Sequence, residues 1–300
     1  MIRFFHSDRF VPKLPDGHRF PISKYQLVRE QLLYEGAIEE GQLVEAGLAD
    51  EADILRVHTR AYWEAMRDLK LDARAMRRIG FPQSEILVER SRRSVQGTLM
   101  AALHALDHGC GVNLAGGTHH AYADHGEGFC LLNDIAVAAR YLLDHNLAHR
   151  LLIVDLDVHQ GNGNAVIFAR DERVFTFSMH CQANYPLRKE ASDLDLGLDV
   201  GTDDNTYLNV LRDHLSKLIN QHKPDLIFFQ AGVDVLATDK LGRLGLTPYG
   251  GRLRDEMVIE ACLERQIPLA ISMGGGYSER LADTVNGHVE TFRLAAEAFG

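Results

Sequence analysis

The sequence predicts a single α/β domain, residues 1–300, built on an open parallel β-sheet flanked by helices. Short runs of β-branched and aromatic residues alternate along the chain with longer segments of helical periodicity. The later runs are almost continuously apolar, which is typical of parallel strands covered on both faces. Such alternation favours right-handed strand–helix–strand crossovers within one sheet. Neither a repeat nor a linker rich in Pro, Gly or Ser divides the chain.

The predicted elements follow one another in a simple order. A short aromatic run, IRFFH, predicts a first strand, and a long helical pattern precedes the second. Each later strand is a run such as LLIVDLDV or DLIFFQAG, and helical patterns separate most of these runs. The predicted strands are 2–6, 111–116, 151–158, 174–179, 225–232 and 268–276, and the predicted helices are 85–108, 131–146, 205–222 and 248–265.

Composition and charge exclude several classes of protein. Of the 300 residues, 46% are hydrophobic and 25% are charged, which is ordinary for a globular chain with a full core. Asp and Glu number 42 against 32 Lys and Arg, a formal net charge of −10. Such a chain does not coat nucleic acid or an anionic bilayer by bulk charge, so we expect neither as a direct partner. A small or a cationic substrate remains compatible with this charge.

The opening segment, the lack of a long apolar run and the scattered cysteines predict a cytoplasmic protein. The opening MIRFFHSDRF is not a secretory signal, and no run of eighteen apolar residues could span a membrane. The four cysteines are scattered without a CxxC pair, so we expect reduced, buried thiols. Oligomeric state cannot be predicted from these features.

Polar residues follow five of the predicted strands at the point where each strand ends. In parallel sheets the ligand crevice lies beyond the carboxyl ends of the strands. The runs GVNLAG, LLIV, VFTFSM, DLIFFQAG and PLAISM lead into GTHHAYADHGEGF, DLDVHQGNG, HCQANYP, VDVLATD and GGGYSE respectively. Together these segments bring His, Asp, Gly and Tyr to one rim, and they predict an active site there.

A metal site is predicted from the segment DLDVH. In an extended chain, Asp155, Asp157 and His159 project to one side. Asp234, after the run FFQAGV, supplies another carboxylate from a neighbouring strand end. Asp157, His159 and Asp234 would form a three-ligand site with an open position for water, the arrangement of a catalytic metal. Two carboxylates and an imidazole suit Zn²⁺, and could also hold Fe²⁺ or Co²⁺.

Two further motifs carry groups suited to hydrolysis. His119 and His120 follow a Gly-Gly turn, and imidazoles can serve as base and acid near neutral pH. Asp155 is placed to orient one of these rings by accepting its N–H. Tyr277 follows Gly274, Gly275 and Gly276, so its phenol could donate a hydrogen bond to a developing oxyanion. Taken separately, the histidine pair could equally be polar surface, and the glycine turn could equally precede a tyrosine that only packs in the core.

Taken together, the motifs resemble the zinc-dependent histone deacetylase family. The resemblance rests on GGTHHAYADHGEGFCLLND, VDLDVHQGNG, FSMHC, QAGVDVLATDKLGRLGLT and SMGGGY in this order, and on the early HRFPISKY. It spans roughly residues 2 to 290. The variant HQGNG and the compact length are most similar to the class IV, bacterial-type branch. The resemblance implies an arginase-like fold with about eight parallel strands.

The resemblance also implies roles for individual residues. The metal ligands would be Asp157, His159 and Asp234, and Asp155 would hold a relay imidazole, His119. His120 would be the general base that activates water, and Tyr277 the oxyanion donor. The walls of a substrate tunnel would include Phe129, Tyr185, Gly128 and Gly275, and a structural K⁺ would bind at Asp155, Asp157, His159 and Ser178. Asn162 stands where much of the family has Asp facing the His120 position, so we expect a lower pKa for His120.

Several functions remain open at this stage. The implied reaction is removal of acetyl or longer acyl groups from lysine side chains or similar amines. An acetylpolyamine amidohydrolase is an alternative function that would use the same hydrolytic chemistry. A binuclear Mn²⁺ ureohydrolase would need a further acid near His159, where the sequence has Gln160 and Gly161. A non-catalytic acyl-lysine binder is the alternative from a different class, and the filled catalytic positions argue against it.

Overall fold

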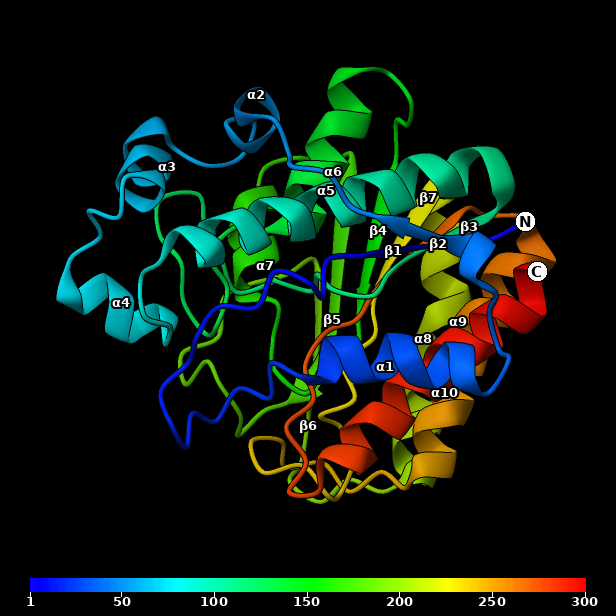
Figure 1. Cartoon of the computed structure of the whole chain (residues 1–300). Helices are drawn as coiled ribbons and strands as arrows, with labels where there is room; N and C mark the ends of the chain where they lie inside the picture. The colour runs from blue at the N-terminus through cyan, green and yellow to red at the C-terminus, as the bar shows by residue number, and fades with distance from the viewer.

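Eight parallel strands form one sheet in the order β2-β1-β3-β8-β7-β4-β5-β6. The computed structural model describes residues 1–300 and is shown in Figure 1. The strands are β1 (Arg3–His6), β2 (Leu43–Glu45), β3 (Cys110–Asn113), β4 (Leu151–Asp155), β5 (Val174–Cys181), β6 (Leu194–Leu198), β7 (Leu226–Gln230) and β8 (Leu269–Ser272). The predicted fold class, a parallel sheet of about eight strands in one α/β domain, is confirmed.

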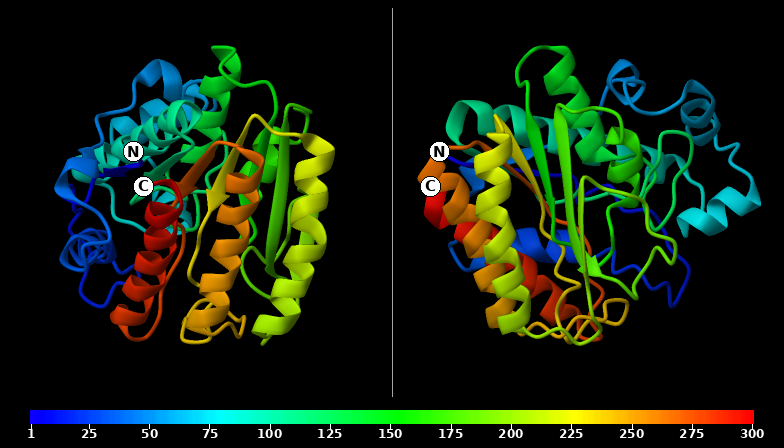
Figure 2. Two further views of the ribbon diagram at one scale, coloured as in Figure 1. Left: turned by 90° about the vertical axis from the view of Figure 1, so that its right-hand side faces the viewer. Right: turned by 180° about the vertical axis from the view of Figure 1, so that it is seen from behind.

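Helices cover both faces of the sheet, so the molecule has three layers. In Figure 2, α8, α9 and α10 lie side by side on one face, while α5 and α6 pack together on the other. The helices are α1 (Lys24–Tyr34), α2 (Glu51–Ile54), α3 (Arg60–Arg67), α4 (Ala73–Ile79), α5 (Glu85–His108), α6 (Asp134–Asp144), α7 (Asn162–Phe168), α8 (Asp204–His222), α9 (Pro248–Arg265) and α10 (Leu281–Phe299), with a 3₁₀ turn at Glu40–Gln42. No helix is both long and apolar enough to cross a membrane.

The apolar strands explain the two covering layers, because successive side chains point to opposite faces of a sheet. In β4, Leu152 and Val154 join a core of 59 buried residues shared with α8, α9 and α10. Leu151 and Ile153 of the same strand join a second core of 17 residues beneath α5 and α6. A run with apolar residues at every position is therefore what a strand between two helical layers requires. All four cysteines are free thiols and buried.

Several elements were not predicted, for physical reasons. The strands β2 and β6 lie at the two edges of the sheet and lack a continuous apolar run. The helices α1 to α4, α7 and α10 were also missed, most of them short or with mixed polar and apolar faces. Conversely, the predicted strands at 151–158, 225–232 and 268–276 were too long. Their last residues leave the sheet and form the loops at its carboxyl edge.

Candidate metal and catalytic site

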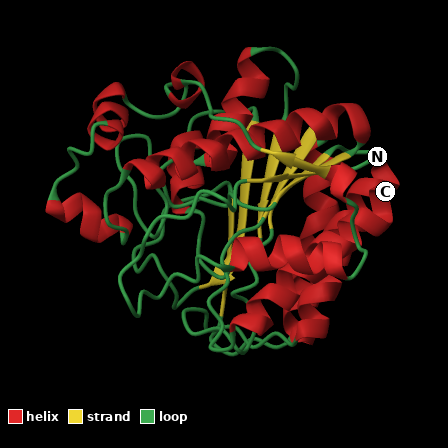
Figure 3. Ribbon diagram, viewed as in Figure 1, coloured by secondary structure: helices red, strands yellow, loops and turns green.

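The four central strands, β3, β8, β7 and β4, lie side by side and deliver four loops to one edge of the sheet. Figure 3 shows long loops gathered on one side of the molecule. The order of these strands across the sheet differs from their order along the chain. Residues near 119, 157, 234 and 277 therefore meet in space, as the rule for ligand crevices in parallel sheets predicts.

Asp157, His159 and Asp234 form a compact cluster of three buried groups. One possible ligand atom from each lies within 4.8 Å of the other two. The Nδ1 atom of His159 is 3.1 Å from Oδ1 of Asp157 and 3.1 Å from Oδ2 of Asp234. The structure thus brings together the three residues predicted as ligands. The predicted strand geometry was wrong in one respect, because β4 ends at Asp155 and the following residues bend.

Backbone amides hold the two carboxylates in place. The amide of His159 donates to Oδ1 of Asp157 at 3.0 Å, and the amide of Gly275 donates to Oδ2 at 2.8 Å. The amide of Val158 donates to Oδ1 of Asp234 at 3.0 Å. These contacts orient the acids and leave other oxygen lone pairs directed toward His159. The arrangement is preorganised for a cation.

The electrostatics of the cluster fit a divalent metal. Burial raises the pKa of Asp234 to about 7, and the nearby carboxylate of Asp157 adds to this effect. Burial disfavours a charged ring at His159, but hydrogen bonds to both carboxylates outweigh it and raise the pKa to about 10. Without a metal, a proton on His159 thus offsets the buried negative charge of the two carboxylates. A divalent cation would replace it, and metal uptake would release that proton. The donor set of two carboxylates and an imidazole suits Zn²⁺.

Gly275 lies close to the carboxylates of the predicted metal site. A Cβ atom added at this position would lie 2.0 Å from Oδ2 of Asp234 and 2.8 Å from Oδ2 of Asp157. Only glycine allows the backbone after β8 to approach the carboxylates this closely. The sequence placed Gly275 in the tunnel wall, and the structure places it beside the carboxylates and the small inner cavity.

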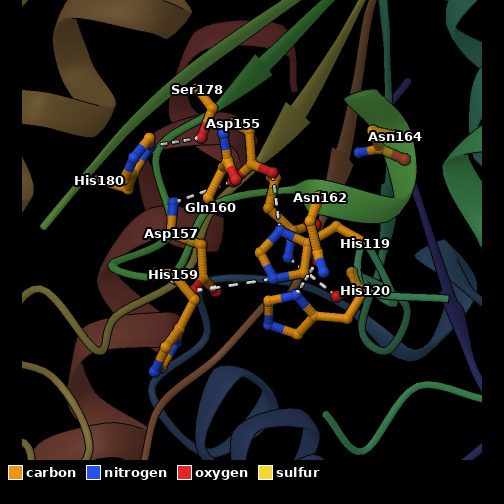
Figure 4. Close-up of polar contacts among 12 residues, drawn as sticks. His119, His120, Asp155, Asp157, His159, Gln160, Asn162, Asn164, Ser178 and His180 are labelled. Atoms are coloured by element: carbon orange, nitrogen blue, oxygen red, sulfur yellow. Dashed lines mark hydrogen bonds and ion pairs between the residues drawn. The ribbon is translucent and has the colours of Figure 1, made fainter. Parts of the chain in front are cut away.

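The imidazoles of His119 and His120 lie beside the cluster, 4.1 Å apart between ring centroids (Figure 4). The Nδ1 atom of His119 is 2.7 Å from Oδ2 of Asp155. Burial alone would lower the pKa of His119, but the charges of Asp155 and Asp157 raise it to about 9. Asp155 therefore fixes this ring and stabilises its charged form.

His120 has a different environment, because its Nδ1 atom faces an amide. The Nδ1 atom lies 2.6 Å from Oδ1 of Asn162. Burial holds the pKa of His120 well below its usual value, and the neighbouring rings of His119 and His159 lower it further. The amide nitrogen of Asn162 donates to Oε1 of Glu127 at 2.6 Å. Glu127 thus fixes the amide so that its oxygen faces His120, a role that the sequence did not reveal.

A buried acid at the start of α6 supports the loop that carries the two histidines. Asp134 accepts hydrogen bonds from the amides of Gly117 and Thr118 and from the hydroxyls of Thr98 and Thr118. The side chain of Gln230 at the end of β7 donates to the carbonyl of Gly117. Asp134 lies within the quoted motif LLND, but no role was assigned to it from the sequence. Its contacts place it as a positioning residue.

A cavity of about 420 Å³ leads from the surface to His120, His159 and Tyr277. Phe129 and Tyr185 line it, and the Tyr185 ring lies 5.0 Å from the His120 ring in an edge-to-face arrangement. Gly128 lies against both His120 and Tyr185, since a Cβ there would be 2.7 Å from the first and 3.3 Å from the second. The structure therefore brings three of the four predicted wall residues, Phe129, Tyr185 and Gly128, to the cavity that ends at the Asp157–His159–Asp234 cluster.

Tyr277 packs among aromatic rings at the base of this cavity. Its ring centroid lies 6.0 Å from that of Phe129 and 6.1 Å from that of Phe20. The amide of Tyr277 donates to Asp239 at 2.6 Å, which fixes the backbone after the three glycines. Burial raises the pKa of the phenol well above its usual value, with Asp234 and Asp157 adding to the effect. The hydroxyl therefore stays protonated and can donate.

Lys24 is a buried charged residue close to the site that sequence reasoning missed. Its Nζ donates to the carbonyl of Gly274 at 3.0 Å and lies 5.4 Å from the ring centroid of Tyr277. Burial lowers its pKa to about 8, although the charges of Asp234 and Asp157 oppose this shift. Lys24 lies in the early HRFPISKY element, which was the available signal.

Ser178, predicted at a structural K⁺ site, lies opposite Asp155 in the register of β4 and β5. Its hydroxyl lies 3.0 Å from Nδ1 of His180. Both Ser178 and Asp155 are buried, so oxygen atoms from the two strands lie close together beneath the histidine loop. The structure thus places Ser178 beside Asp155, one of the other three residues of the predicted K⁺ set.

Comparison with known proteins identifies relatives over nearly the whole chain. Residues 18–292 match the family described as the histone deacetylase domain. An uncharacterised protein of a Picosynechococcus strain is 45% identical over 295 residues, covering 98% of both chains. Histone deacetylase 2 of Arabidopsis thaliana is 32% identical over 282 residues, which cover 91% of this chain and 73% of that protein.

Solved structures share the fold at lower sequence identity. The crystal structure of an HDAC homologue complexed with SAHA superposes with a TM-score of 0.83 at 22% identity, covering 99% of this chain and 84% of the other. An HDAC homologue from Aquifex aeolicus gives a TM-score of 0.81 at 22% identity, covering 97% and 82% respectively. These two similarities show that the chain shares its fold with those proteins.

Proposed function

The chain belongs to the histone deacetylase family, and from this premise we propose that it is a zinc-dependent hydrolase that removes acetyl or longer acyl groups from lysine side chains. One observation carries the proposal: Asp157, His159 and Asp234 converge at the base of a cavity that also presents His120 and Tyr277. A ligand set, a general base and an oxyanion donor are the groups that metal-assisted amide hydrolysis requires.

Asp157, His159 and Asp234 would hold the metal, for which Zn²⁺ is the first choice and Fe²⁺ the second. When bound, the metal supplies Lewis-acid polarisation of the acyl carbonyl and lowers the pKa of water at the site. A structural K⁺ would lie nearby at Asp155, Asp157, His159 and Ser178, where carboxylate, carbonyl and hydroxyl oxygens suit a hard cation.

The protein's own groups would manage the protons. His120, whose pKa is held low by burial, is neutral near neutral pH and can accept a proton from the attacking water. The same ring would then protonate the departing amine. His119, held charged by Asp155, would stabilise developing negative charge beside it. The protonated phenol of Tyr277 would donate a hydrogen bond to the carbonyl oxygen as its charge develops.

The cavity explains how an acylated lysine would reach this site. Its aromatic walls, Phe129 and Tyr185, suit the apolar methylene chain of a lysine, and the acyl group would lie at the base near Tyr277. A smaller inner cavity of about 40 Å³ continues past the histidines. Acetyl groups would fit most simply in this space.

The alternatives have less support from the site. A binuclear ureohydrolase needs a second ligand set, and the structure has one group of three possible ligands. The residue after His159 is Gln160, whose side chain is bound to Glu190 and Asp195 rather than directed to the cluster. A non-catalytic acyl-lysine binder would not need the hydrogen-bonded His119–Asp155 pair. An acetylpolyamine amidohydrolase uses the same chemistry, so only the substrate distinguishes it.

The test compares turnover across acyl-lysine peptides and acetylpolyamines. Zinc-loaded protein should hydrolyse at least one of acetyl-, butyryl-, octanoyl- or myristoyl-lysine peptides, and a chelator should abolish this activity until zinc is restored. His120→Ala should lose nearly all turnover and keep its zinc. Faster cleavage of acetylpolyamines than of every peptide would favour the polyamine alternative. Zinc-loaded protein without activity on any of these amides would contradict the proposed function.

A further inference from the structure

The entrance of the active-site cavity is lined by four arginines and by no acidic residue. Arg19, Arg77, Arg78 and Arg243 are exposed and line the same 420 Å³ cavity that ends at His120, His159 and Tyr277. They come from three distant parts of the sequence: the segment before α1, the last turn of α4 and the loop after β7. We call these four residues the arginine rim. This concentration of positive charge is unexpected in a chain of net charge −10.

None of the four guanidinium groups forms an ion pair or a hydrogen bond with another residue of the chain. Many arginines elsewhere behave differently. Arg56 pairs with Asp144, and Arg67 pairs with Asp68. The arginine rim therefore keeps its charge uncompensated at the entrance, where it can act on an incoming molecule. A groove lined by one sign of charge concentrates ligands of the opposite sign.

The backbone around the arginine rim is tied to the walls of the cavity. At the end of α4, the carbonyls of Arg78 and Ile79 accept hydrogen bonds from the amides of Gly128 at 3.1 Å and Phe129 at 2.8 Å. Arg77 and Arg78 therefore occupy a helix end that is fixed to the loop forming the tunnel wall. Their position at the entrance follows from the same contacts that build the tunnel.

The other two arginines are fixed in the same way. Arg19 lies between His18, which bonds to the carbonyl of Gly80 at 2.8 Å, and Phe20, whose ring packs 5.3 Å from that of Phe129. Arg243 follows Gly242, where an added Cβ would lie 1.9 Å from the carbonyl oxygen of Asp234, a proposed metal ligand. All three segments are thus anchored to the site itself.

We propose that the arginine rim selects acyl-lysines in acidic sequence, with Asp or Glu on either side of the acylated residue. The inference rests on the proposed function and adds its substrate class. Acylation removes the charge of the lysine itself, so the charge of the flanking residues decides how the peptide meets the rim. Arginine suits this role because its planar donors pair with carboxylates. Acetylpolyamines and lysine-rich tails would be repelled by the same charges.

The test uses three peptides with the same central acetyl-lysine and with flanks of Glu and Asp, of Gln and Ser, or of Lys and Arg. Both kcat/KM for deacylation and Kd by fluorescence anisotropy are measured. An exposed ion pair is worth a factor of about 1.5 to 5, so several together should favour the acidic peptide over the basic one by about tenfold or more. Raising the ionic strength toward about 1 M, where the Debye length is about 3 Å, should remove most of this preference.

Two variants assign the preference to the rim. The double variant Arg77→Gln, Arg78→Gln should reduce the ratio of kcat/KM for the acidic peptide to kcat/KM for the basic peptide by about threefold or more. Arg77→Glu with Arg78→Glu should lower this ratio more than the double Gln variant does, because the new carboxylates attract the basic peptide. The matched control is Arg170→Gln, an exposed arginine between α7 and β5 at the opposite edge of the sheet. It should leave the ratio unchanged.

The outcomes separate this inference from the proposed function. Equal kcat/KM and Kd for the three peptides, or a preference that survives in the double variant, would overturn the role of the rim and leave the hydrolase intact. A preference in Kd without turnover of any peptide would support the rim and contradict the proposed function. Nα,Nε-diacetyl-lysine, whose carboxylate is its only charge, tests a small-molecule source: turnover above that of the acidic peptide would overturn the assignment to peptides.

Discussion

Tyr277→Phe separates catalysis from stability at a single hydroxyl group. The substitution removes one oxygen and keeps the ring that packs near Phe129 and Phe20. The hydroxyl makes no hydrogen bond within the protein, so its loss leaves no buried partner unsatisfied. If the phenol donates to the developing oxyanion, turnover should fall by about 10²- to 10³-fold, equivalent to about 2.7–4 kcal/mol.

The assay compares Tyr277→Phe with Tyr62→Phe, a matched buried tyrosine. The hydroxyl of Tyr62 donates to the carbonyl of Leu131 at 2.8 Å, so its loss should lower the free energy of unfolding by about 1–3 kcal/mol. The folded Tyr62→Phe enzyme should keep its kcat. Tyr277→Phe should show the opposite pattern, with the loss mainly in kcat because the contact strengthens in the transition state.

Zinc content and thermal unfolding are measured on the same preparations. A folded, zinc-loaded Tyr277→Phe protein with wild-type kcat would refute the role of Tyr277 as oxyanion donor. A lower melting temperature with kcat retained would identify it instead as a structural tyrosine.

Three other predictions follow from the same geometry. Asn162→Asp should raise the pKa of His120, because a carboxylate would then face its Nδ1 atom. Glu127→Gln is made with it, because Glu127 would otherwise repel the new carboxylate. Since protonation of His120 abolishes activity, the acid limb of the kcat/KM profile should move to higher pH. An acid limb at the same pH would contradict the contact between residues 162 and 120. Gly275→Ala should lower zinc affinity, measured by competition with a chelator, because its Cβ would displace both carboxylates, whereas Gly41→Ala, in open space, should not. Equal zinc affinities would show that the carboxylates tolerate the shift. A hydroxamate should inhibit the zinc-loaded enzyme, since its two oxygens can chelate, and absence of inhibition at about millimolar concentration would count against a mononuclear site.

The sheet was predictable from sequence to the extent that its strands are buried. Strands such as β4 and β7 lie between two helical layers, and their continuous apolar runs follow directly from that position. The edge strand β6, with the sequence LDLGL, has one layer at most to cover it and gives no such run. The same argument explains the overlong predicted strands, because residues such as Leu156 and Val158 are buried below the loops without belonging to the sheet.

The polar groups of the site were predictable because parallel strands end at a common edge. Because the carboxyl ends of these strands converge, the sequence alone predicts that Asp157, His159 and Asp234 lie close together. The supporting residues were not predictable in this way. Glu127 and Asp134 act through hydrogen bonds across the fold, and their sequence positions carry no periodicity or spacing that distinguishes them from ordinary loop and helix-start acids.

The arginine rim could not be predicted from the sequence, for a related reason. Arg19, Arg77 and Arg243 are far apart in the chain, and overall composition indicates an acidic protein. Bulk charge averages over the whole surface, whereas a substrate meets only the few residues around one entrance. Net charge therefore excluded partners that bind broad surfaces and did not describe the local field at the cavity.

Metal content is the most direct test of the central claim that Asp157, His159 and Asp234 form a mononuclear metal site. Elemental analysis of the purified protein should give one zinc per chain. Asp157→Asn and Asp234→Asn should each lose most of it, because each removes a charged ligand from a set of three. Asp213→Asn, at an exposed position on α8, is the control and should keep its zinc. Two manganese ions per chain, or near-normal zinc in both ligand variants, would contradict the account.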